Sequence, residues 1–237
     1  MAAPLDILRA EAAGLGLQIQ LGLGPRYDER AGAGLRLRDL APFARGGLLL
    51  LSGGPAFFDR FAAAGPHAGA DPLDDWTRAL VERLLVPLRT AGIEAQARHP
   101  FVGEAAPLPF QRIGAAAGLG APARIGLTLH PVHGSWIAYR ALLLLSCPVE
   151  EHPLPAFTPC ESCAAPCIPA CPAGAVATGG WDAAGCSNHR VDHGDPCASG
   201  CHARLACPVG ADARYGDEAL RFHQAASFAT ASAWRNP

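Results

Sequence analysis

The sequence contains no lysine: all 19 basic residues among its 237 are arginines. A Walker-type phosphate loop, a Schiff-base nucleophile and a catalytic lysine base each need a lysine amine, so these three kinds of site are excluded. The chain also has no G-x-G-x-x-G turn placed between a strand and a helix, and no G-x-S-x-G nucleophile elbow. Several large classes of enzyme are therefore excluded.

Charged residues are few and nearly balanced. The 21 acidic and 19 basic residues give a formal net charge of −2. Such a chain is not attracted to a nucleic-acid backbone or an anionic membrane, so neither is expected as a partner. The apolar run over 137–149 contains Arg140 and is shorter than the roughly 20 residues of a membrane span. The N-terminus carries Asp6 and Arg9 and has no secretory pattern, so we expect a soluble, cytoplasmic protein.

Helical and strand patterns alternate up to about residue 150, which predicts an α+β (α/β-like) sheet-and-helix domain over 1–150. One helix is expected over 4–14. Another should begin at Pro72 after an Asp71 cap and end at Gly92. Residues 114–120 should form the end of a helix and a turn. The expected strands are 17–22, 46–53, 93–98, 124–130 and 137–146, with the apolar run 46–53 as the buried central strand.

The C-terminal third is organised by cysteine. Residues 147–159 contain four prolines and are expected to form a linker. Eight of the nine cysteines follow, between Cys160 and Cys207, in a region where hydrophobic periodicity fades. A bound inorganic core should replace the missing apolar one in a small domain over 151–213. The tail over 214–237 is expected to carry one short helix.

The eight cysteines form two sets of four, and each set ends in Cys-Pro. Such endings point to two iron–sulfur clusters, because a cubane cluster needs four converging thiolates. In two-cluster ferredoxins the cysteine before the proline ligates the other cluster, so we expect the last member of each set to be exchanged. The expected ligands are Cys160, Cys163, Cys167 and Cys207 for one cluster, and Cys171, Cys186, Cys197 and Cys201 for the other.

Zinc and disulfides are the alternatives for these cysteines. Zinc would use cysteine pairs, with His189, His193 or His202 as further ligands. Disulfides do not suit a reducing compartment. Cys147 is left over at the end of an apolar strand and is expected to be a small buried hydrophobic residue.

The order of the cysteine motifs resembles the two-cluster ferredoxin-like domain of the epoxyqueuosine reductase and reductive dehalogenase group. That order is CxxC, a single Cys, CP, a lone Cys and then three more ending in CP. The spacing differs, because the gaps here are three residues before the third Cys, and three and five residues in the last part. The resemblance implies two [4Fe-4S] clusters.

Three earlier blocks, over 48–61, 71–84 and 123–146, resemble cobalamin-processing proteins of the CblC type. The resemblance implies a nitroreductase-like domain that holds a corrinoid. In the CblC type, the arginine that matches Arg140 is associated with the binding of a thiol substrate. Glycines there would let the backbone approach a flat ring. Alternatively, the glycines lie in turns, Trp136 belongs to the core and Arg140 is a solvated strand residue. The implied corrinoid-binding residues are Gly118, Gly120, Gly126, His130, Pro131, Gly134, Trp136 and Arg140.

Together these resemblances imply a corrinoid-dependent oxidoreductase that passes electrons from two [4Fe-4S] clusters to cobalamin. The reaction would be cobalamin reduction or dealkylation, or a reduction that uses the corrinoid. The electrons would come from a ferredoxin, a flavodoxin or a flavoprotein reductase. One alternative is an epoxyqueuosine reductase-like enzyme acting on tRNA, but the acid of that family is matched only by Glu104, out of register. Another is a ferredoxin-type electron carrier without a corrinoid.

Overall fold

A computed structural model describes residues 3–101, 107–120 and 122–235. The chain divides into two compact units. The first contains Met1–Gly120 and Ile137–Ala156, and the second contains Ala121–Trp136 and Phe157–Pro237. Segment 121–136 therefore groups with the cysteine-rich part, although it lies within the domain expected over 1–150. Among the described residues, no helix is long and apolar enough to cross a membrane.

The first unit is built on one antiparallel sheet in the order β1-β2-β4-β3. All eight residues of β2 are buried, which confirms that the apolar run 46–53 is a central strand. The strands are β1 (Ile19–Leu23), β2 (Gly46–Gly53), β3 (Ala95–Arg98) and β4 (Ile137–Leu145). Four of the five expected strands are thus present, and the α+β class is confirmed.

The strand expected over 124–130 is wrong. This segment forms turns, with isolated bridges that join Pro122 to Thr128 and His130 to Gly134. The physical reason is Gly126, whose φ of +74° lies in the left-handed region and interrupts an extended chain. The alternation of apolar and polar residues there marks partly buried turns.

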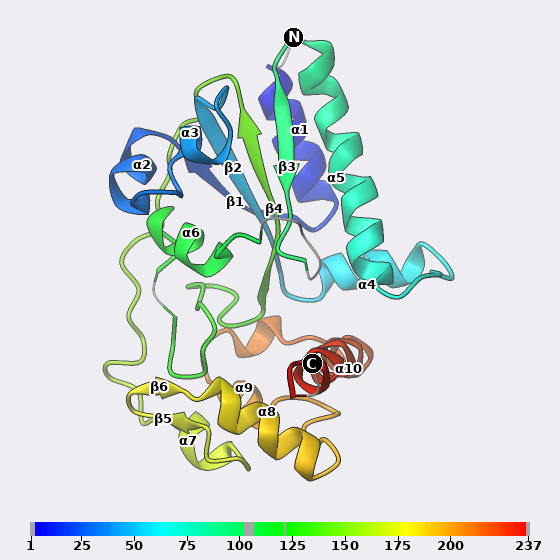
Figure 1. Cartoon of the computed structure of the whole chain (residues 1–237), viewed down its shortest axis with the longest axis vertical. Helices are drawn as coiled ribbons and strands as arrows, with labels where there is room; N and C mark the ends of the chain where they lie inside the picture. The colour runs from blue at the N-terminus through cyan, green and yellow to red at the C-terminus, as the bar shows by residue number, and fades with distance from the viewer. Residues whose placement is uncertain (1–2, 102–106, 121, 236–237) are drawn as a thin grey trace. The chain divides into compact units, whose positions relative to one another are not determined.

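The expected helices of the first unit are confirmed as α1 (Pro4–Gly14) and α5 (Pro72–Thr90), which pack side by side (Figure 1). Asp71 stands at the N-cap of α5, but its side chain makes no capping hydrogen bond. Pro87 lies inside α5 without ending it. Further helices are α2 (Pro25–Ala31), α3 (Leu37–Leu40), α4 (Ala56–Ala63) and α6 (Phe110–Ala116).

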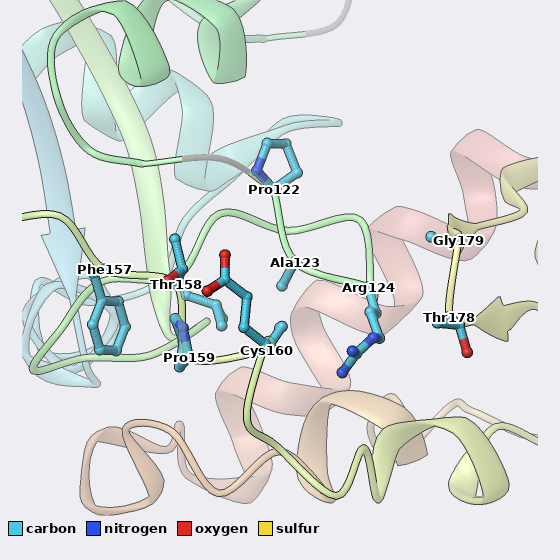
Figure 2. Close-up of a pocket in the computed structure, with 12 residues that line it drawn as sticks. Pro122, Ala123, Arg124, Phe157, Thr158, Pro159, Cys160, Thr178 and Gly179 are labelled. Atoms are coloured by element: carbon cyan, nitrogen blue, oxygen red, sulfur yellow. The ribbon is translucent and has the colours of Figure 1, made fainter.

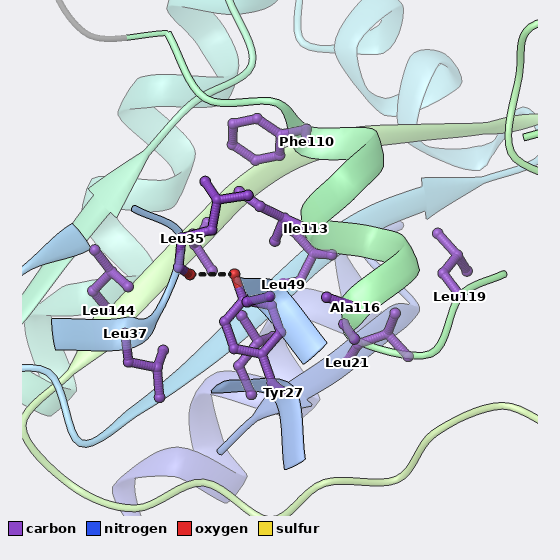
Figure 3. Close-up of a cluster of buried hydrophobic side chains, with 14 of the residues drawn as sticks. Leu21, Tyr27, Leu35, Leu37, Leu49, Phe110, Ile113, Ala116, Leu119 and Leu144 are labelled. Atoms are coloured by element: carbon purple, nitrogen blue, oxygen red, sulfur yellow. Dashed lines mark hydrogen bonds between the residues drawn. The ribbon is translucent and has the colours of Figure 1, made fainter. Parts of the chain in front are cut away.

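One apolar core of the first unit lies between the sheet and helices α2 and α6 (Figure 3). Tyr27 of α2 is fully buried in it, and its hydroxyl donates a hydrogen bond of 2.7 Å to the carbonyl oxygen of Leu35. The carboxylate of Glu151 accepts hydrogen bonds from the backbone N–H groups of Arg26 and Tyr27, at 3.0 and 2.8 Å. The proline-rich segment that contains Glu151 is therefore tied to the start of α2.

The second unit has short elements around the cysteines and one long helix. A small apolar cluster includes Ile125, Cys167, Val176 and Ala203. The tail, expected to carry a short helix, forms a 19-residue helix that packs against α8. The elements are α7 (Cys167–Ala170), β5 (Val176–Ala177), β6 (Gly180–Trp181), α8 (Ala183–Asp192), α9 (His202–Leu205), η1 (Ala211–Ala213) and α10 (Asp217–Arg235).

Replacing Tyr27 by Phe should lower the free energy of unfolding by about 1–3 kcal/mol, because the buried carbonyl of Leu35 would lose its donor. Urea unfolding followed by circular dichroism measures this difference. A loss below about 0.5 kcal/mol, the size expected of an ordinary surface substitution, would show that this hydrogen bond does not stabilise the core.

Candidate functional site

One cavity of the second unit collects four cysteine side chains. Two come from the loop before α7, one begins α7 and the fourth follows α9. Ile125 and Leu129 of segment 121–136 complete its apolar wall. The cysteines that line this cavity are Cys160, Cys163, Cys167 and Cys207.

A second cavity collects the other four cysteines of the two sets. Trp181, His189 and Arg190 line it as well. The cysteines that line this cavity are Cys171, Cys186, Cys197 and Cys201. Each Cys-Pro cysteine thus lines the cavity of the opposite set, which is the grouping expected from the sequence. That the eight thiols hold two clusters stays a prediction.

Burial governs the acidity of these thiols. It raises the pKa of Cys167, Cys186, Cys197 and Cys207 above the usual value for a cysteine. Neighbouring thiols of the same cavity act in the same direction, whereas Arg190 lowers the pKa of Cys186 and Cys197. Metal binding must deprotonate these thiols, so it is coupled to proton release.

Arg190 forms a buried ion pair at the wall of the second cavity. Its guanidinium donates to both carboxylate oxygens of Asp195, at 2.7 and 2.9 Å. It also donates to the Ser227 hydroxyl and the Gln224 carbonyl, both at 3.0 Å. Both partners of the ion pair have side chains less than a tenth exposed. The pair therefore joins α8, which carries Cys186, to α10.

The donor set of both cavities suits a soft metal centre, because eight thiols are present and thiolates select iron–sulfur clusters or zinc. Of the three histidines named for zinc, His189 and His202 line the second cavity. His193 stacks on His189 at 4.3 Å between ring centroids. Within the described ranges, no three His, Cys, Asp or Glu side chains are arranged to hold a single metal ion. Cys147, expected to be buried, is half-buried.

A larger cavity of about 320 Å³ adjoins the first cysteine set within the second unit (Figure 2). Loops around Arg124, Phe157 and Thr178 form its walls. Cys160 lines both this cavity and the first cysteine cavity. Among the described residues, no hydrogen bond or ion pair engages the guanidinium of Arg124. The cavity therefore offers one positive and one negative charge, from Arg124 and Glu161, with hydroxyl groups and an aromatic ring beside a cysteine.

Five residues of the expected corrinoid site lie in segment 121–136. A Cβ at Gly126 would collide with the indole of Trp181, and one at Gly134 would collide with the carbonyl of Val209. Trp136 is fully buried, as in the core alternative. His130 Nδ1 accepts hydrogen bonds from the N–H groups of Val132 and His133, which hold the turn that includes Pro131. The described contacts of the two glycines are thus with protein, and their role toward a corrinoid stays a prediction.

Burial, assisted by the neighbouring His133, lowers the pKa of His130 to about 4. The imidazole is therefore neutral near pH 7, in keeping with its role as an acceptor. The exposed tip of the same loop is Val132, which is 68% exposed.

The other three expected residues belong to the first unit. Gly118 and Gly120 both have positive φ after α6, and a Cβ at Gly118 would meet Pro153 at 2.8 Å. Arg140 is only 5% exposed, so the alternative that it is a solvated strand residue is wrong. Glu104, the possible match to a family acid, lies outside the described residues.

A β-bulge places Arg140. Leu50 and Leu51 of β2 pair with Ala141 and Tyr139 of β4, so Arg140 has no opposite residue. Its Nε donates to the Ser52 hydroxyl at 3.1 Å, and its guanidinium lies 4.6 Å from the centre of the Phe57 ring. A bulge turns a side chain out of the regular pleat, and bulges are common beside active sites.

Two more polar residues accompany Arg140. His99 Nδ1 donates to the Arg140 carbonyl at 2.9 Å. Burial raises the pKa of Asp74 to about 6, against the opposing charge of Arg140. Asp74 is an acid in the first turn of α5, a position that by itself only favours the positive end of a helix. The sequence assigns no role to Ser52 or His99. No signal in one strand reveals a neighbour that approaches from another element.

Replacing Asp74 by Asn should stabilise the protein more at pH 7 than at pH 4. A carboxyl with a raised pKa binds more protons in the folded state, so its contribution to stability falls as the pH rises from near 3.8 to about 6. Asn removes this dependence. Thermal unfolding across the pH range checks it, with the exposed Asp75→Asn variant as the control. An unchanged difference between Asp74→Asn and wild type from pH 4 to pH 7 would contradict the raised pKa.

No protein-family model matches the sequence, and no curated protein matches it. Solved structures do match. An epoxyqueuosine reductase is 18% identical with a TM-score of 0.62, over 92% of this chain and 68% of that one. A reductive dehalogenase, described with B12-dependent dehalogenation, is 17% identical with a TM-score of 0.54, over 96% of this chain and 34% of that one. The Caenorhabditis elegans B12-trafficking protein CblC is 17% identical with a TM-score of 0.51, over 93% and 91%.

The chain is thus structurally similar over most of its length to proteins of the B12-related group, which confirms the resemblance seen in the sequence. At these identities the likeness establishes the fold. The chain spans about one third of the dehalogenase.

Proposed function

We propose that this protein is an iron–sulfur redox protein that carries two [4Fe-4S] clusters and passes electrons to a bound corrinoid. The observation that carries the proposal is the pair of cavities, each lined by four cysteines, with the Cys-Pro cysteines exchanged between the two sets. This exchange is the ligand pattern of two-cluster ferredoxins.

The residues present suit two clusters. Cys160, Cys163, Cys167 and Cys207 would hold one, and Cys171, Cys186, Cys197 and Cys201 would hold the other. The clusters would supply one-electron transfer at low potential. An apolar wall that includes Ile125, Val176 and Ala203 packs against some of these cysteines. The buried Arg190–Asp195 pair holds α8 in place, and with it Cys186.

A corrinoid is the acceptor that best accounts for the first unit and segment 121–136. The supporting observations are the fold shared with a B12-trafficking protein and with a B12-dependent dehalogenase. Low-potential iron–sulfur donors suit the reduction of a corrinoid cobalt. The residues proposed to bind or shape the site are Gly118, Gly120, Gly126, His130, Pro131, Gly134, Trp136 and Arg140.

Their contacts suggest different roles for these residues. Gly126, Gly134 and Trp136 would shape segment 121–136 through their packing on protein. His130 and Pro131 would present the loop surface, and Arg140 would supply a positive charge in the first unit. Since no nicotinamide-binding turn is present, the electrons would come from a ferredoxin, a flavodoxin or a flavoprotein reductase. The reaction would be reduction or dealkylation of the corrinoid, or reduction of another substrate through it.

Double cysteine variants test the exchanged ligands. Anaerobically purified wild type should contain about eight irons per chain, and loss of one ligand should remove about half. Cys171→Ala combined with Cys201→Ala removes two ligands of one cluster and should leave about four irons. Cys171→Ala combined with Cys163→Ala damages both clusters and should leave almost none.

The reverse result for the two double variants would show that each set of four binds its own cluster. Cys147→Ala, outside both cavities, should keep the full iron content and serves as the control. Zinc in place of iron in the wild type would overturn the cluster proposal.

Titration with cob(II)alamin tests the corrinoid. We expect saturable binding with the spectral change of a cobalt that has lost its lower base. Val132→Asp puts a charge at the exposed tip of the His130–Gly134 loop and should weaken binding at least about tenfold, equivalent to about 1.4 kcal/mol. Val86→Asp is the matched control, because Val86 is 55% exposed on α5. The absence of any saturable change in wild type would favour an electron carrier without a corrinoid.

A further inference from the structure

Arg204 is a half-buried cation in the stretch of chain that connects the two cysteine cavities. It lies in α9, three residues after Cys201 and three before Cys207 (Figure 1 shows α9). Cys201 lines the second cavity and Cys207 lines the first. The short stretch from Cys201 to Cys207 therefore connects the two cavities, and Arg204 is its middle residue.

The guanidinium of Arg204 is held by aromatic rings and by a backbone carbonyl. Its carbon lies 4.2 Å from the centre of the Trp136 ring and 5.1 Å from that of Tyr215. Nη2 donates to the carbonyl of Ser135 at 2.7 Å, and Nε donates to the Ser135 hydroxyl at 3.4 Å. Trp136 is fully buried, and Tyr215 is 7% exposed. The planar group is thus fixed in one position.

Arg204 differs in its charge balance from Arg190, the buried arginine of the second unit. Arg190 is neutralised by both oxygens of Asp195. No carboxylate among the described residues forms an ion pair with Arg204, whose partners are all uncharged at neutral pH. Nε1 of Trp136, in the same wall, is also buried without an acceptor among the described residues.

A half-buried charge without a counter-charge has lost part of its hydration, and aromatic faces offset only part of that cost. Negative charge supplied nearby by the second unit would therefore stabilise Arg204. The thiol of Cys201 interacts electrostatically with this guanidinium. A [4Fe-4S] cluster ligated by four thiolates carries a net negative charge, which grows by one when the cluster accepts an electron.

We propose that Arg204 is the counter-charge of the two clusters and favours their reduced state. This inference rests on the proposed function, because it requires the clusters. Arg204 is then a positioning residue, which acts through its charge on the reduction potential of the clusters. Each reduction takes one electron from a low-potential donor and adds one negative charge to a cluster. A fixed nearby cation stabilises that added charge and raises the potential.

Redox titration of the holoprotein, poised with dithionite and followed by electron paramagnetic resonance, tests the inference. Arg204→Gln removes the charge but can still donate a hydrogen bond to Ser135. At a fixed potential, the ratio of reduced to oxidised cluster should fall about tenfold for at least one cluster, equivalent to about 59 mV for a one-electron couple. Arg204→Lys keeps the charge and should retain most of the wild-type ratio.

Arg221→Gln is the matched control. Arg221 lies on α10 with a side chain that is 64% exposed. Its replacement by Gln therefore changes the net charge by the same amount as Arg204→Gln, but it removes a charge that lies in solvent. It should leave the ratio unchanged. Iron content is measured for every variant, and wild type without clusters would overturn the proposed function itself.

Equal potentials for Arg204→Gln, Arg221→Gln and wild type, at full iron content, would overturn the inference and leave Arg204 as a structural link to Ser135 and Trp136. If Arg204→Gln fails to retain iron, Arg204→Met, which is also neutral but keeps an apolar side chain against Trp136, takes its place. A potential at least 59 mV below that of wild type supports a role of charge, and a wild-type potential contradicts it.

Discussion

The convergence of eight thiols is the constraint on which the second unit depends. Its apolar cluster is small, and it includes Cys167, while Cys171 and Cys201 pack against it. Cys171 and Cys207 each line the cavity of the opposite set, so neither set can be assembled without the other. A metal centre in each cavity would therefore join distant parts of the chain and supply the stability that a small apolar core cannot.

The same constraint explains why segment 121–136 groups with the cysteines. Its glycines approach protein closely: Gly126 faces Trp181, and Gly134 faces the carbonyl of Val209, two residues after Cys207. Arg204 adds hydrogen bonds to Ser135 and a stacked contact with Trp136. The segment that carries most of the expected corrinoid residues is thus built into the cysteine-rich unit. Changes at Gly126 or Gly134 would reach the cysteine cavities, so they cannot test corrinoid binding alone.

In the first unit, a bulge and burial create a polar site inside an apolar fold. Arg140 is the extra residue of β4, and it meets Ser52 and Phe57 from other elements. Asp74 approaches from α5, and its pKa is raised to about 6 by burial. A protonatable carboxyl beside a fixed cation is suited to proton transfer or to binding an anionic group. This arrangement complements a unit that is proposed to hold a reduced cofactor.

Elements whose signals are local can be predicted from the amino-acid sequence alone. The run 46–53 is a strand because its apolar residues need burial on both faces, and Pro72 begins a helix because its fixed φ suits the first turn. The exchange of Cys171 and Cys207 was also expected from the Cys-Pro endings. The turns over 124–130, the long tail helix packed on α8 and the half-buried positions of Asp74 and Arg204 follow from the folded structure alone. These features depend on contacts between residues far apart in the chain, and such contacts leave no periodic pattern within a single segment.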